Sequence, residues 1–170
     1  MFAAQVHLAL NHAPLFAVIV GTAFLAVAVF RKNAMWRRLA FGFLLAAALV
    51  AIPVYLTGES AEAVVEQDTS VAHGLIHRHE DAAWWAFVLM EILGTLSLVQ
   101  LALPRWGRTP PSWVVAVTLL LGLVVSGVVI RTAHLGGQIH HSYLRTDSGQ
   151  AIQDVGIDPR TDSHEPVDQD

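Results

Sequence analysis

Four long apolar runs divide the chain and predict four membrane-spanning helices. The runs cover residues 13–30, 39–56, 82–103 and 113–130, and Glu91 is the single charged residue within them. Each run holds at least 18 residues, which is enough for a helix to cross a hydrocarbon core of roughly 30 Å. We therefore expect an all-α integral membrane four-helix bundle over residues 1–141, with spans at about 13–30, 39–56, 82–103 and 113–134.

The alternating direction of four such helices brings most histidines to one membrane face. The start of the first helix, the end of the second, the start of the third and the end of the fourth must emerge on the same side. Eight of the nine histidines map to this side, which we call the histidine-rich end: His7, His12, His73, His77, His79, His134, His140 and His141. One interfacial histidine is ordinary because its ring is amphipathic, but this gathering predicts a ligand-binding site.

Basic residues in the short connections predict the orientation. The loops at the opposite end of the bundle, which we call the basic end, hold Arg31, Lys32, Arg37, Arg38, Arg105 and Arg108. The histidine-rich end has fewer, namely Arg78, Arg131 and Arg145. Since lysine and arginine are enriched in cytoplasmic loops, we expect an N-out/C-out protein, which in a bacterium means an inner-membrane protein. The histidine-rich end and both termini would then be periplasmic.

Composition narrows the chemistry that such a bundle can perform. The 170 residues are 54% hydrophobic and 14% charged, which fits one bundle without a second folded domain. The net charge of −4 argues against nucleic acid as a partner. The chain has no cysteine, which excludes covalent c-type haem, thiolate-held iron–sulfur clusters and thiolate copper sites. Nitrogen or oxygen must therefore hold any metal, and the acidic tail at 142–170 should be periplasmic and disordered on its own.

Prolines, small residues and the segments between spans predict local structure. Pro53 should kink the second helix or end it early, and residues 57–60 (TGES) should then turn the chain. Residues 71–81 should form a helical lead into the third span. On the fourth helix, glycines share a stripe with His134 and His141, which leaves room for close packing or for a flat macrocycle. Beyond a weak similarity between the two hairpins, we find no repeat.

Glu91 falls near the middle of the third span. An ionised carboxylate costs at least a few kcal/mol there, so Glu91 should face the bundle interior and be protonated or hydrogen-bonded. Intramembrane acids often serve in proton relays or quinone sites, which makes Glu91 a proton or quinone candidate. The alternative is a neutral carboxyl bonded to Thr22, Thr95 or Ser126 on neighbouring turns or helices.

Four segments together resemble a family of bacterial four-helix membrane proteins known only as a domain of unknown function. They are HLALNHAP at 7–14, TGESAEAVVE at 57–66, IHRHEDAA at 76–83 and TAHLGGQIHH at 132–141. The resemblance covers nearly the whole chain up to the tail. It implies the four-helix fold and picks out His7, Asn11, His12, Pro14, Thr57, Gly58, His79, Glu80, Gly136, Gly137 and His141.

The resemblance therefore favours His7, His12, His79 and His141 as ligands and leaves His73, His77, His134 and His140 as secondary candidates. Helix bundles commonly hold cofactors between facing helices, and imidazoles with small, apolar neighbours suit haem b. Arginine pairs well with carboxylates, so Arg78, Arg131 and Arg145 are candidate partners of the haem propionates. A bare zinc, copper or non-haem iron ion on the same histidines is the alternative.

These features predict an electron-transfer subunit rather than a self-contained enzyme, because no nucleophile and base pair stands out. We expect a haem b subunit of a larger respiratory or photosynthetic complex, in contact with other membrane subunits, a periplasmic redox partner and the lipid bilayer, with a quinol site as a further option. One bis-histidine haem and two haems side by side both fit the histidine count. A subunit with a structural or assembly role is the remaining class.

Overall fold

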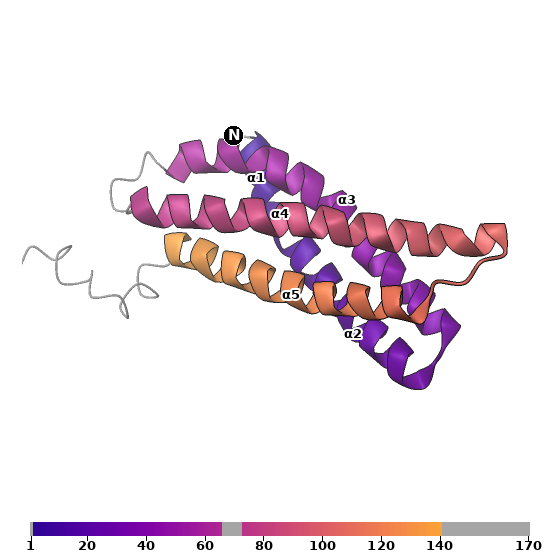
Figure 1. Ribbon diagram of the computed structural model, residues 1–170. Helices are drawn as coiled ribbons and strands as arrows, with labels where there is room; N and C mark the ends of the chain where they lie inside the picture. The colour runs from indigo at the N-terminus through magenta and orange to yellow at the C-terminus, as the bar shows by residue number, and fades with distance from the viewer. Residues whose placement is uncertain (1, 66–72, 141–170) are drawn as a thin grey trace, which may run out of the picture.

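The computed structural model describes residues 2–65 and 73–140, all of which belong to helices or to short connections between them (Figure 1). Residues 142–170, His141 and Arg145 lie outside the described residues, so the expectations about the tail rest on sequence alone. The elements are α1 (Phe2–Leu10), α2 (His12–Arg31), α3 (Ala34–Val65), α4 (His73–Ala102), a short 3-10 helix η1 (Leu103–Trp106) and α5 (Ser112–His140).

Four helical segments are long and apolar enough to cross a membrane, which confirms the all-α four-span fold. They run over Phe2–Arg31, Ala34–Ala61, Gly74–Trp106 and Ser112–Ile139. At most 33% of the residues in the most hydrophobic window of each segment are buried within the protein. Large apolar side chains such as Phe16, Leu49, Leu98 and Leu120 therefore point outward, as helices that face lipid require.

The spans pack as a ring in which α2 contacts α3, α3 contacts α4, α4 contacts α5, and α5 contacts α2. In Figure 1, α4 and α5 run side by side, and α3 lies against α4 on the other side. The short helix α1 packs on α3 and α2, and among the described residues it makes no contact with α4 or α5.

Small residues allow these helices to approach closely. A Cβ atom added to Gly21 of α2 would lie 2.8 Å from Leu44 Cδ2 of α3. At Gly122 of α5 it would lie 2.7 Å from Thr22 Oγ1 of α2. Gly94 of α4 likewise packs directly on α3, with no room for a side chain. Helix association in membranes depends on such backbone proximity, because lipid is as apolar as the protein core.

The connection between α2 and α3 at the basic end is short and hydrogen-bonded. Lys32 adopts a left-handed conformation (φ 49°), and its N–H bonds to the carbonyl of Ala28. Asn33 Oδ1 then accepts the backbone N–H groups of Met35 at 2.8 Å and Trp36 at 3.3 Å. Asparagine side chains commonly cap helix starts in this way, and the cap fixes where α3 begins.

Of the two outcomes expected at Pro53, a kink or an early end, the early end is wrong, and so is the turn expected at residues 57–60. α3 continues through Pro53 to Val65. Proline removes one backbone donor, but the Thr57 hydroxyl donates to the Pro53 carbonyl at 2.7 Å and lies 3.2 Å from the Val54 carbonyl. This bond reinforces the turn that follows Pro53 and does not replace the donor that the Leu49 carbonyl, four residues before the proline, loses. The expected helical lead into the third span is confirmed, since α4 already begins at His73.

Candidate functional site

His7 on α1 is held against α3 by a single hydrogen bond. Its Nδ1 atom lies 2.9 Å from the carbonyl oxygen of Val54. A carbonyl only accepts, so Nδ1 carries the proton and the ring lone pair is on Nε2. Gly58 lies beside the ring, where an added Cβ would be 3.7 Å from His7 Cε1. The half-buried imidazole is thus fixed in one tautomer against the α3 backbone.

His79 on α4 is held against α5 in the same manner. Its Nδ1 atom lies 3.1 Å from the carbonyl oxygen of Thr132, so the lone pair is again on Nε2. Gly136 lies beside this ring, and an added Cβ would come 3.1 Å from His79 Cε1. Such a distance is tighter than ordinary van der Waals contact, so the ring packs on the α5 backbone because residue 136 has no side chain.

The two histidine sites share one local design. In each hairpin the histidine is on the first helix, and the second helix offers a carbonyl and, four residues later, a glycine: Val54 and Gly58 for His7, Thr132 and Gly136 for His79. A helical side chain covers the turn before its own Cα, so a glycine uncovers the carbonyl four residues earlier. Sequence reasoning missed these carbonyls, although the glycines that accompany them were available as a signal.

Further residues of the resemblance surround His7. Asn11 stands at the break between α1 and α2, and its N–H bonds to the His7 carbonyl at 2.9 Å. The break precedes buried Pro14, which lacks the donor that the Leu10 carbonyl would otherwise receive. Asn11 Oδ1 is buried and has no partner among the described residues. The amide thus brings an unused acceptor to the same turn as His7.

The other described histidines have more open settings. His12 is exposed. His77 is exposed and pairs with Glu80 at 3.2 Å, so Glu80 engages the surface histidine. His134 is also exposed, with its Nε2 3.2 Å from Gln138 Nε2. The structure therefore sets His7 and His79 apart from these three, while His73 begins α4 and His140 ends α5.

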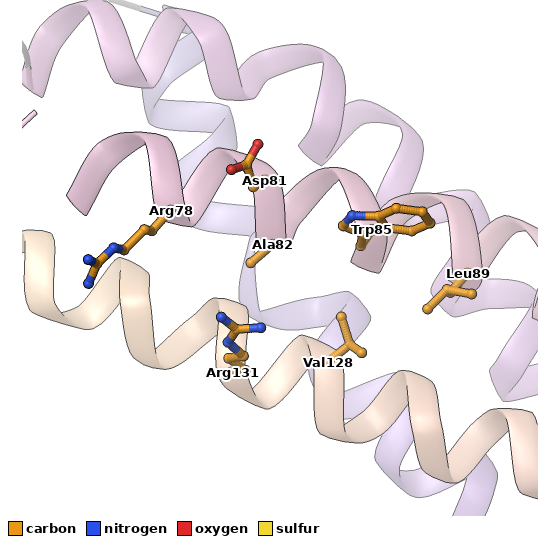
Figure 2. Close-up of a pocket in the computed structure, with 7 residues that line it drawn as sticks. All are labelled: Arg78, Asp81, Ala82, Trp85, Leu89, Val128 and Arg131. Carbon is orange, nitrogen blue, oxygen red and sulfur yellow. The ribbon is translucent and has the colours of Figure 1, made fainter. Parts of the chain in front are cut away.

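Two of the three arginines expected to pair with the haem propionates, Arg78 and Arg131, lie near each other. Arg78 of α4 and Arg131 of α5 line one groove of about 460 Å³ between the two helices, and both guanidinium groups point into the space between them (Figure 2). Apolar residues of the two helices continue the groove toward the middle of the span. The groove thus combines two cations with an apolar wall.

Glu91 has no hydrogen bond to any described residue, and its Oε1 atom is buried. The alternative, a neutral carboxyl bonded to Thr22, Thr95 or Ser126, is therefore not found among the described residues: Ser126 donates to the Gly122 carbonyl of its own helix at 2.8 Å, and Thr22 Oγ1 has no partner in the described chain. Serine and threonine in apolar helices often bond back to the preceding turn, and Ser126 follows this pattern.

Within residues 2–65 and 73–140, no three histidine, cysteine, aspartate or glutamate side chains gather in a way that could hold a metal ion. What the structure does show is two histidines with the same local setting, each bonded through Nδ1 to a backbone carbonyl and each with a glycine beside it. His141, the fourth ligand that the resemblance favours, lies outside the described residues.

The sequence comparison agrees with the helical arrangement. Residues 4–146 match the family described as "Predicted membrane protein (DUF2231)". The chain belongs to this family. The match covers all four spans and every segment that carries the resemblance, and the family description adds no activity to the membrane assignment. No curated protein and no solved structure matches the chain significantly.

Proposed function

We propose that the protein binds b-type haem at its histidine-rich end, where His7 and His79 would hold the iron, and acts as an electron-transfer subunit of a larger respiratory or photosynthetic complex. The observation that carries the proposal is the matched setting of the two histidines. Each donates Nδ1–H to a backbone carbonyl and each therefore has its lone pair on Nε2.

This setting is what a ligating imidazole requires. Histidines that bind metals nearly always donate the other ring N–H to a carbonyl, a carboxylate or water, which fixes the ring and strengthens it as a ligand. Haem iron bound by two such imidazoles exchanges single electrons. Gly58 and Gly136 hold the two rings close to backbone, so the second helix of each hairpin sets the orientation of its histidine.

The position of the histidines limits how electrons could move. Every histidine of the four-helix domain maps to one end of the spans, so the chain offers haem ligands in one half of the membrane. Electrons would enter and leave at that face, and the chain would require other membrane subunits or a periplasmic redox partner. Glu91, as a buried carboxyl in the span without a hydrogen bond, is the residue that would serve an adjacent quinol or proton step.

The direct test is an absorption spectrum of the purified protein, first oxidised and then reduced with dithionite, with metal analysis of the same sample. We expect a sharpened Soret band, a reduced α band and iron close to one equivalent per chain. A colourless protein would contradict the proposal, and stoichiometric zinc or copper in that sample would instead assign the histidines to a bare ion.

The orientation is tested by labelling intact cells. The basic end carries six lysines and arginines in its two loops, so we propose that it faces the cytoplasm and the histidine-rich end faces the periplasm. A single cysteine at Asn33 should resist a membrane-impermeant maleimide, whereas one at Ser60 should react. The reverse pattern would place the histidines on the cytoplasmic side.

A further inference from the structure

The groove between α4 and α5 has a polar end and an apolar end. Its lining residues are Arg78, Asp81, Ala82, Trp85, Leu89, Val128 and Arg131. Figure 2 shows the two guanidinium groups at the histidine-rich end of the groove, directed into the space between the helices, with Trp85, Leu89 and Val128 farther along the span. A ligand that fits must therefore be an amphiphile.

The positive charge of the groove favours an anionic ligand. Arg78 and Arg131 are both exposed, and neither forms an ion pair with another described residue. Asp81 also borders the groove, but its carboxylate points away from α5 in Figure 2. Guanidinium groups bind phosphate oxygens with two parallel hydrogen bonds, so two of them from neighbouring helices form a suitable frame for a phosphodiester.

The position of the groove along the span indicates that its ligand is a membrane lipid. Trp85 is 57% exposed, and Trp84 beside it is 45% exposed. Tryptophan concentrates at the membrane interface, where the ring meets headgroups and the upper acyl chain. Leu89 lies one turn deeper on α4. A phospholipid in the bilayer would have its phosphate at the arginines and its chains along the apolar wall.

We propose that this groove binds an anionic phospholipid from the leaflet at the histidine-rich end, with the phosphate between Arg78 and Arg131 and an acyl chain along Trp85, Leu89 and Val128. Trp85 is exposed beside the groove, on the outer surface of the span, whereas His79 packs on Gly136. The arginine pair therefore serves the lipid phosphate and not the haem propionates, and this assignment does not depend on the proposed function.

The test uses the full-length protein in detergent and native mass spectrometry with phosphatidylglycerol, phosphatidylcholine of the same chains and glycerol 3-phosphate. We expect phosphatidylglycerol to bind in preference to the other two. Each basic residue near a membrane surface contributes about 1 kcal/mol to anionic lipid binding, so R78Q and R131Q should each weaken it roughly fivefold. Val128→Phe should also weaken it, because it narrows the apolar wall and leaves the charge unchanged.

The matched control is R105Q with R108Q, which removes two exposed arginines at the basic end and should leave binding unchanged. Equal binding of both phospholipids, or unchanged affinity in R78Q/R131Q with its helix content retained, would overturn the proposal. Binding of glycerol 3-phosphate as tightly as the lipid would show a phosphate site without a lipid. Loss of haem from R78Q/R131Q with unchanged lipid binding would return the arginines to the propionates.

Discussion

Replacing both His7 and His79 with alanine is expected to abolish low-spin haem binding. Each histidine is proposed to supply one axial ligand, so the single variants His7→Ala and His79→Ala should shift the haem toward a high-spin spectrum or lose it, and the double variant should be colourless. The proton on each Nδ1 is fixed by a carbonyl on another helix, and no neighbouring imidazole among the described residues has the same backbone anchor.

Controls come from the exposed histidines of the same end. His77→Ala and His134→Ala should retain the reduced α band, since His77 pairs with Glu80 at the surface and His134 is exposed, with its Nε2 3.2 Å from Gln138 Nε2. The haem-to-protein ratio distinguishes one haem from two. If other histidines hold a second haem, each single variant should lose only the haem at His7 and His79 and keep half of the total. Low-spin haem in the double variant would sink the assignment and promote His12 and His141.

The fold could be predicted from the sequence because each membrane span is a long apolar stretch of the chain. The four runs needed only length and absence of charge to be recognised, and the alternation of helices then placed the histidines at one end. The end of the second span, α3, could not be predicted in this way. Pro53 is a strong local signal for a break, but α3 continues through it, and His7 of α1 bonds the Val54 carbonyl on the turn that follows.

The choice among histidines could not be made from sequence spacing. The carbonyl that anchors His7 is 47 residues away and the one that anchors His79 is 53 residues away, so each ring orientation depends on helix packing. The resemblance named Gly58 and Gly136 without a reason for either. The structure supplies the reason: each glycine uncovers a carbonyl for an imidazole, and at position 136 an added Cβ would also crowd the His79 ring.

Replacing Gly136 is expected to lower haem binding while the bundle stays folded. An added Cβ would lie 3.1 Å from His79 Cε1, so alanine should push the ring slightly and valine should displace it from the Thr132 carbonyl. Loss of a partner that orients a ligand typically costs 10–100-fold in affinity, and Gly136→Val should fall within about this range. Haem titration of each purified variant gives the affinity, and circular dichroism reports the helix content.

The control for Gly136→Val is Gly127→Val on the same helix, because a Cβ at Gly127 meets no atom within 4 Å. This variant carries the same change in helix propensity and should bind haem as the unaltered protein does. Gly58, which lies beside His7 as Gly136 lies beside His79, should respond differently. An added Cβ at Gly58 is 3.7 Å from His7, which is an ordinary contact. Gly58→Ala should therefore leave haem affinity unchanged, whereas Gly136→Ala should already lower it. Equal haem affinity of Gly136→Val and Gly127→Val would show that the position of the His79 ring does not govern the cofactor, and would remove His79 from the ligand pair.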